Sequence, residues 1–197
     1  MRKGHNYECF ISGSDEALAY VESVYPDDCE TLIIGGNHDY SFFKHHQQDL
    51  LKLLSRLRPD IHYLGMHKAA FRVHGMEVAM FHGSGMGAAS NRLTRTYSNA
   101  CRDGPKPDLV VNGHLHHWNL CPEYGKRKAL LVQAACFQGT TQYERSIDKI
   151  PQIGGMIVWR DEEAEKMMYE LKNFDEVRHD HPGLIIDDYP EPIIDDS

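Results

Sequence analysis

The spacing of apolar residues predicts two helices and one strand in the first third of the chain. Apolar side chains recur every three or four positions over residues 14–25 and again over 50–57, which is typical of helices that bury one face. Each stretch is closed by a proline, as is common at helix ends. Between them, residues 31–34 form a short apolar run that ends at Gly35–Gly36. This order places Asn37–Asp39 in a loop at the carboxyl end of a strand.

The rest of the chain is richer in strand patterns. The runs 69–74 and 76–82 are separated by a short turn and predict a β-hairpin. A polar helix is expected near 88–101, and further strands are expected at 61–64, 108–112, 128–136, 154–160 and 165–172. Since βα units come first and strands dominate later, the order favours an α/β sandwich over a doubly wound sheet. This sandwich would have two sheets with helices outside.

Composition and charge divide the chain into a body, residues 1–172, and a tail, residues 173–197. The tail contains eight acidic residues and one arginine, so it carries −7 of the formal net charge of −8. We expect this acidic, proline-containing tail to be extended. The nearly neutral body leaves nucleic-acid binding open, because only a local basic patch could release counter-ions from a phosphate backbone.

Apolar runs in the chain are too short to cross a bilayer, so no membrane association is expected. The five cysteines form no CxxC pair. Such a scattered, odd set is typical of reduced thiols, which indicates a cytoplasmic protein.

Four potential metal ligands lie just after predicted strands: Asn37, His82, His114 and His116. In α/β architectures, side chains at the carboxyl ends of strands converge on one crevice. In an extended segment, His114 and His116 would face the same side. Amide oxygen and imidazole nitrogen donors favour Mn, Fe, Zn, Co or Ni over Mg or Ca. Each element alone has an ordinary structural explanation, but all of them together, each after a strand, predict a metal site.

These segments resemble three motifs of the calcineurin-like metallophosphoesterase superfamily. The motifs read GGNHDY at residues 35–40, FHG at 81–83 and GHLHH at 113–117. The resemblance extends over about residues 5–172 and implies the αββα sandwich of that family. It also implies phosphoester hydrolysis by a metal-activated hydroxide. The GNHD form is more similar to the diesterase and nuclease branches than to the protein phosphatases.

The resemblance also implies roles for individual residues. Asn37 and His82 would bind a second metal ion together with His114, whereas His116 would bind a first ion. His38 would stand over the substrate as an acid, and Asp39 would orient the ring of His38. The cofactor would then be two divalent transition ions, with manganese among the candidates.

Two motifs of the family are absent from this sequence. No Asp-x-His strand end and no Gly-Asp-x-x-Asp motif precede Gly35. In the family, these motifs supply two ligands of the first ion and the carboxylate that bridges both ions. The only Asp-x-His is Asp60–Ile61–His62, which follows GNHD at the start of a strand and is interpreted as unrelated. The domain at 1–172 therefore lacks the N-terminal strands and motifs of the family, and this chain would bind two ions, one or none.

The sequence therefore predicts a metal-dependent phosphoesterase, in a truncated or partial form, that acts on a phosphodiester or phosphomonoester. Nucleic acids and nucleotides are among the candidate substrates. The alternative is a non-catalytic member that keeps the fold as a binding or scaffold protein. The missing strands would leave an unpaired sheet edge, so a homo-oligomer or another partner that completes this edge is expected.

Overall fold

The computed structural model describes residue 11, residues 13–83 and residues 89–174. The expected acidic tail lies almost entirely outside these described residues. The helices are α1 (Ser14–Val24), α2 (Asn37–His46), α3 (Leu50–Leu57), α4 (Ala89–Asp103) and α5 (Gln142–Ser146). The strands are β1 (Thr31–Gly35), β2 (Ile61–Met66), β3 (Lys68–Val73), β4 (Met76–Phe81), β5 (Leu109–Asn112), β6 (Asn119–Tyr124), β7 (Ala129–Gln133), β8 (Gly154–Asp161) and β9 (Lys166–Asn173).

A five-stranded sheet forms the centre of the fold, in the order β3-β4-β5-β7-β6. The three inner strands are parallel, and the two edge strands are antiparallel to their neighbours. Every residue of β7 is buried, as expected for a strand that is covered on both faces. Because the inner strands are parallel, the loops after β4 and β5 emerge at the same edge of the sheet.

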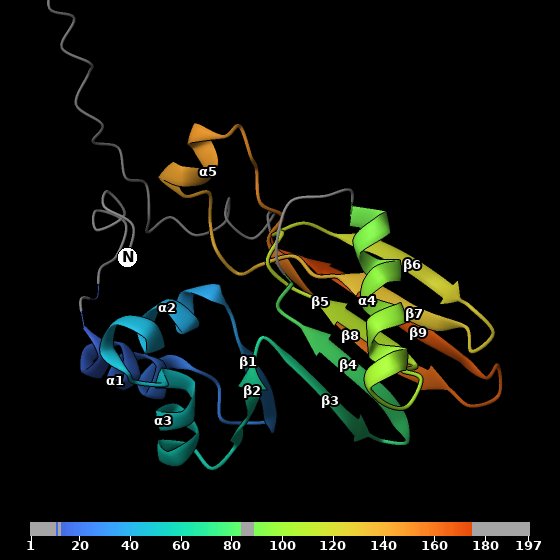
Figure 1. Ribbon diagram of the computed structural model, residues 1–197, viewed down its shortest axis with the longest axis horizontal. Helices are drawn as coiled ribbons and strands as arrows, with labels where there is room; N and C mark the ends of the chain where they lie inside the picture. The colour runs from blue at the N-terminus through green and yellow to red at the C-terminus, as the bar shows by residue number, and fades with distance from the viewer. Residues whose placement is uncertain (1–10, 12, 84–88, 175–197) are drawn as a thin grey trace, which may run out of the picture.

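The two faces of this sheet are covered by different elements (Figure 1). On one face, Leu93 of α4 packs with Val110 and Leu131 in a buried apolar cluster. On the other face, Met156 and Val158 of the β8–β9 hairpin pack against a second cluster. Burial of these side chains is the main force that holds the helix, the central sheet and the hairpin together.

A smaller α/β unit precedes the central sheet. Strands β1 and β2 form a parallel pair, and α1, α2 and α3 lie beside it (Figure 1). Arg58 connects the parts of this unit because its buried guanidinium donates hydrogen bonds to the backbone oxygens of Glu22, Tyr25 and Pro26. The same group forms an ion pair with Asp60, 2.6 Å away. Arg58 thereby satisfies carbonyl groups that the end of α1 leaves without partners inside the helix.

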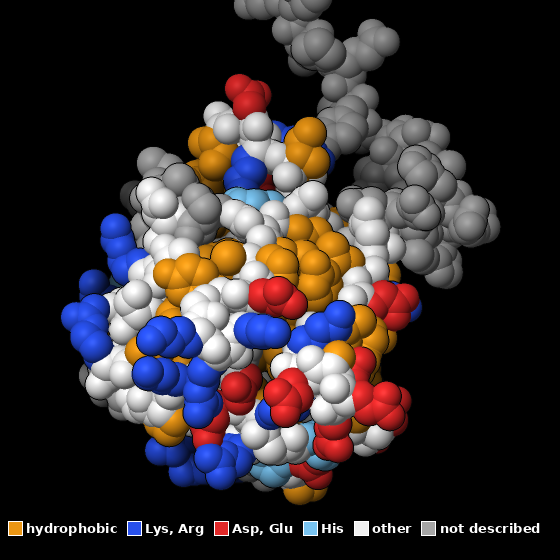
Figure 2. Space-filling model, turned by 90° about the vertical axis from the view of Figure 1, so that its right-hand side faces the viewer, with side chains coloured by type: hydrophobic (Ala, Val, Ile, Leu, Met, Phe, Trp, Pro, Cys, Tyr) orange, Lys and Arg blue, Asp and Glu red, His pale blue; other side chains and the backbone are white. Residues whose placement is uncertain are grey.

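The outer side of the β8–β9 hairpin remains partly open. Ile157 and Trp159, which alternate with the inward-facing Met156 and Val158, are 51% and 43% exposed. Figure 2 shows hydrophobic side chains gathered above a band of mixed positive and negative side chains on one side of the molecule. Among the described residues, no helix has both the length and the apolar character needed to cross a membrane.

The α/β class expected from the sequence is confirmed, with a central mixed sheet and flanking helices. The predicted hairpin at residues 74–75 and the strands on either side of it are present. The sequence pattern missed α2, α5 and β6. Helix α5 is only five residues long, and β6 is an edge strand with a bulge and only partial burial, so neither shows a sustained apolar period.

Replacing Gly154 with alanine is expected to lower the melting temperature by about 5 °C, because overpacking costs about 1–3 kcal/mol. An added Cβ at this position would overlap the carbonyl oxygen of Lys172 on the paired strand β9. Gly155→Ala is the matched control, since its Cβ would make only an ordinary contact of 3.6 Å with Phe137. Differential scanning calorimetry of both variants checks this, and equal melting temperatures would contradict it.

Candidate metal centre

Three strand ends are joined by backbone hydrogen bonds around His67, the single residue between β2 and β3. The His67 N–H donates to Gly35 O at 2.9 Å, and His67 O accepts from the His82 N–H at 2.8 Å. The Gly113 N–H donates to Phe81 O at 2.9 Å. These bonds hold the ends of β1, β4 and β5 side by side, so the residues that follow each strand face a common site.

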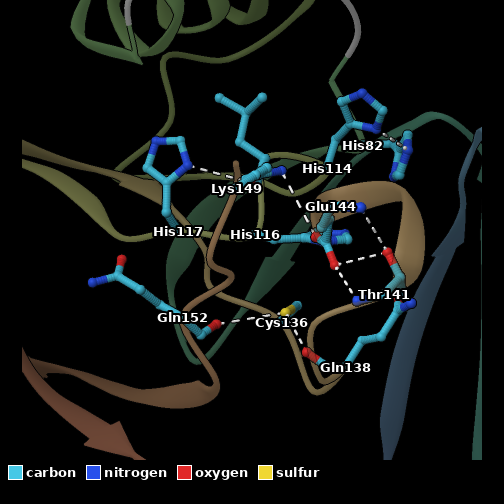
Figure 3. A network of polar contacts seen from close by, with 11 residues as sticks. His82, His114, His116, His117, Cys136, Gln138, Thr141, Glu144, Lys149 and Gln152 are labelled. Carbon is cyan, nitrogen blue, oxygen red and sulfur yellow. Dashed lines mark hydrogen bonds and ion pairs between the residues drawn. The ribbon is translucent and has the colours of Figure 1, made fainter. Parts of the chain in front are cut away.

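Three of the four predicted ligands meet at this site. His82 Nε2 lies 2.6 Å from Asn37 Oδ1 and 3.1 Å from His114 Nδ1. The two imidazole rings meet edge to face, with their centroids 4.9 Å apart, and Figure 3 shows them beside each other. One oxygen and two nitrogen donors, from segments far apart in the sequence, therefore converge around a single point.

Gly36 makes this convergence possible. A Cβ atom at Gly36 would lie 2.6 Å from Cε1 and 2.7 Å from Nδ1 of His82, much closer than non-bonded carbon and nitrogen atoms approach. Gly83, directly after His82, has a φ of 81°, a conformation that glycine adopts without steric cost. The two glycines thus let the backbone pass close to the His82 ring and turn immediately after it.

The GNHD segment differs from its expected conformation. It was predicted as a loop, but Asn37, His38 and Asp39 form the first turn of α2. Asp39 Oδ2 accepts a hydrogen bond of 2.7 Å from the Gly36 N–H, which satisfies a backbone donor at the start of the helix. In the described residues, the hydrogen bond that Asp39 makes is this cap of α2, and its orienting role toward His38 stays a prediction.

Burial favours the uncharged form of the His82 and His114 imidazoles. Desolvation lowers the pKa of His82 to about 4, with nearby His114 adding to this effect. Desolvation also lowers the pKa of His114, and the positive charge of Arg92 lowers it further. His38 is exposed but lies close enough that its charge lowers the pKa of both rings. Neutral rings present lone pairs, as metal ligands must.

His114 and His116 do not face the same side, as an extended segment would require. Their φ angles are 77° and 57°, so the backbone turns through the left-handed region at both residues. This region is uncommon for side chains other than glycine, although histidine is among those enriched there. The turns direct His114 toward His82 and His116 toward Glu144, whose Oε1 lies 2.7 Å from His116 Nδ1.

Glu144 is a site residue that the sequence pattern did not reveal. It is only 3% exposed and belongs to a capping box with Thr141 at the start of α5. Backbone bonds from Gln152 N–H to His116 O and from Cys136 N–H to Gln152 O hold the chain after β7 against the His116 turn. The available signal was the spacing Thr-x-x-Glu over 141–144, which is typical of a capping box.

Two further charged residues border the site. Arg92 of α4 lies 3.5 Å from the position that a Cβ of Gly83 would occupy, and its charge acts on His114. Lys149 lies 4.0 Å from the carboxylate of Glu144 and also lowers the pKa of His114. Desolvation lowers the pKa of Arg92, which indicates that its guanidinium is partly buried. The positively charged side chains of Arg92 and Lys149 would therefore attract an anion bound near His114.

Asp60 and His62 lie at the other end of β1 and β2. Thr31, the first residue of β1, pairs with Ile61, whereas the site begins after the last residue of β1. Asp60 is paired with Arg58, and His62 is paired with Glu30. The interpretation of this Asp-x-His as unrelated to the metal motifs agrees with these positions.

The donor atoms fit one divalent transition ion better than two. Asn37, His82 and His114 offer three neutral donors that already converge, a set that suits Mn, Fe, Co, Ni or Zn. His116 instead contacts a carboxylate, and the described residues contain no cluster of three or more His, Cys, Asp or Glu side chains able to hold a metal. The carboxylate bridge expected from the family resemblance has no counterpart among these residues.

Comparisons with known proteins give structural likenesses only. No protein-family model matches the sequence, and no curated protein matches it. The chain is similar to the structure of an archaeal phosphodiesterase, with 13% identity, coverage of 78% of this chain and 74% of that chain, and a TM-score of 0.45.

Two further similar structures are of Vps29. For Vps29 complexed with Zn²⁺ from Entamoeba histolytica, identity is 11%, coverage is 81% of this chain and 88% of that chain, and the TM-score is 0.41. For Chaetomium thermophilum Vps29, the corresponding values are 10%, 78%, 85% and 0.41. At these identities and TM-scores, the likenesses assign neither a family nor an activity to this chain.

Proposed function

We propose that this protein is a metal-dependent phosphoesterase whose centre is formed by Asn37, His82 and His114. The observation that carries the proposal is the convergence of Asn37 Oδ1 and His114 Nδ1 on His82 Nε2, at 2.6 and 3.1 Å. The substrate class is a phosphoester, with a phosphodiester favoured by the resemblance of the GNHD motif.

These residues would hold a divalent ion through an amide oxygen and two imidazole nitrogens. When bound, such an ion supplies Lewis acidity toward a phosphoryl oxygen. Because all three ligands are neutral, they leave the positive charge of the site uncompensated. Arg92 and Lys149, whose charges act on His114, add to this positive field, which favours binding of an anionic phosphate group.

His38 would act as the proton donor for the leaving group. It is exposed, and its charge acts on both His82 and His114. An imidazole beside a bound phosphoester can protonate the departing oxygen, and its ordinary pKa lies close to neutral pH. In this role, His38 contributes to turnover without being required for metal binding.

One observation favours a second function, that of a non-catalytic binding or scaffold protein. The carboxylates near the site already serve other groups: Asp39 caps α2, and Glu144 binds Thr141 and His116. Without a carboxylate ligand, three neutral donors bind a cation more weakly. A chain of this kind would hold a metal ion, or a partner at the same face, without hydrolysing a phosphoester.

His38→Ala is expected to reduce hydrolysis of bis(4-nitrophenyl) phosphate in Mn²⁺ by about 10²–10⁴-fold, the usual contribution of a general acid. Binding of Mn²⁺, measured by isothermal titration calorimetry, should remain unchanged in this variant. His45→Ala is the matched control, because His45 is an exposed histidine in the last turn of the same helix.

The two measurements separate the candidate functions. Turnover that is lost in His38→Ala and kept in His45→Ala supports the phosphoesterase. Mn²⁺ binding without turnover by the unaltered chain supports the binding protein. If neither Mn²⁺, Co²⁺ nor Zn²⁺ binds, the metal centre itself is refuted.

A further inference from the structure

The carboxylate of Glu144 has more partners than a helix cap requires. Its Oε2 accepts hydrogen bonds from the N–H and the Oγ1–H of Thr141, at 3.0 and 3.1 Å. These contacts complete the capping box of α5. Oε1 remains, and it faces His116 Nδ1 at 2.7 Å and Lys149 Nζ at 4.0 Å. Each oxygen of this buried side chain thus serves a different segment of the chain.

We propose that Glu144 is a positioning residue that fixes the orientation and tautomer of His116. An ionised carboxylate can only accept hydrogen bonds, so the short contact requires a proton on His116 Nδ1. In a neutral ring, the lone pair is then on Nε2, the atom on the other side of the ring. A carboxylate that holds one ring nitrogen in this way is a common support for a histidine that acts through its other nitrogen.

The surrounding backbone makes this arrangement specific. His116 O accepts from the Gln152 N–H at 2.8 Å, and the Lys149 N–H donates to Glu144 O at 2.8 Å. The Gln152 side chain accepts from the Trp118 N–H at 2.6 Å. These bonds hold α5 and the loop after it against the His116 turn. Figure 3 shows Glu144 beside His116 and bonded to Thr141. The ring and the carboxylate are therefore brought together by segments that hydrogen bonds join to one another.

This inference deepens the proposed function and rests on it for the role of His116 at the phosphoester site. With the proton on Nδ1, His116 Nε2 would be free to bind a cation or to accept a proton. It also gives α5, which the apolar pattern of the sequence does not predict, a part in building the site. The tautomer itself can be measured in the metal-free protein, so its outcome is independent of whether the centre binds a metal.

Long-range ¹H–¹⁵N correlation spectra of the metal-free chain test the inference. The unaltered protein is expected to show His116 with a protonated Nδ1 and an unprotonated Nε2. In Glu144→Gln, the amide oxygen would remain with the two Thr141 donors and the NH₂ group would face His116. Nδ1 would then have to accept, so the proton is expected on Nε2.

Thr141→Ala is the matched control, because it weakens the cap of α5 while leaving the carboxylate beside His116. It should keep the proton on Nδ1. A proton on Nε2 in the unaltered chain would overturn the inference, whatever the stability of the variants. An identical shift of the proton in Thr141→Ala and Glu144→Gln would also overturn it, since it would show that Glu144 acts only through the stability of α5.

Discussion

Replacing His82 with alanine is expected to reduce the affinity for Mn²⁺ or Zn²⁺ by at least about 100-fold. Losing a residue that only supports a ligand commonly costs 10–100-fold, and the loss of a ligand should exceed this range. His82 is the central member of the group because its Nε2 lies within 3.1 Å of both other donors. Without this ring, the amide and the second imidazole have no common point of coordination. Isothermal titration calorimetry on the metal-free chain measures the effect.

His62→Ala is the control for this experiment. His62 is also a histidine on a strand, but it is paired with Glu30 at the opposite end of the β1–β2 pair. Its replacement should leave the metal affinity unchanged. Equal losses in the two variants would indicate nonspecific binding to the histidine-rich surface, and an unchanged affinity in His82→Ala would exclude the proposed ligand set.

The part of the site that the sequence predicted depends on strand ends. Short apolar runs end a few residues or fewer before Asn37, His82 and His114. Runs of this kind form strands that are buried on both faces. Strands β4 and β5 are parallel neighbours, so His82 and His114 follow them at the same edge of the central sheet. Strand β1 belongs to a separate two-stranded sheet, and the hydrogen bond from the His67 N–H to Gly35 O brings its end, and with it Asn37, to this edge. Residue type and position along the chain therefore predicted the pair of histidines, whereas the placement of Asn37 depends on a tertiary contact.

The parts that were missed depend on local backbone geometry and on tertiary contacts. Whether Asn37 begins a helix depends on Asp39 satisfying the Gly36 N–H, which an apolar pattern does not record. The separation of His114 from His116 depends on the left-handed backbone at both histidines, on either side of Leu115, although neither is a glycine. Glu144 lies 28 residues after His116, so only the folded chain shows that they meet.

The exposed apolar side chains are a further property that the sequence alone does not locate. Alternation in β8 predicts that every second residue faces inward, yet Ile157 and Trp159 are apolar on the outward side. A helix on each outer face, as the αββα order implies, would cover them. In the described residues, helix α4 covers one face of the central sheet. It does not cover the outer side of the β8–β9 hairpin, where Ile157 and Trp159 lie.

Gly36→Ala is expected to weaken metal binding by about 10–100-fold, the range found when the support of a ligand is disturbed. The φ of −113° at Gly36 is open to alanine, so the backbone itself is not strained by the change. The added Cβ would instead lie 2.6–3.0 Å from three atoms of the His82 ring. The ring must move away by several tenths of an ångström, and it then loses its alignment with Asn37 and His114.

Gly104→Ala separates this steric effect from the general cost of replacing a glycine. A Cβ at Gly104 would meet no atom within 4 Å, and the backbone there is not left-handed. This control should bind Mn²⁺ as tightly as the unaltered chain, as measured by calorimetry. An unchanged affinity in Gly36→Ala would mean that His82 can leave its described position without loss of binding. The metal would then bind with the His82 ring in a shifted position. The close packing of Gly36 against this ring would have no effect on metal affinity.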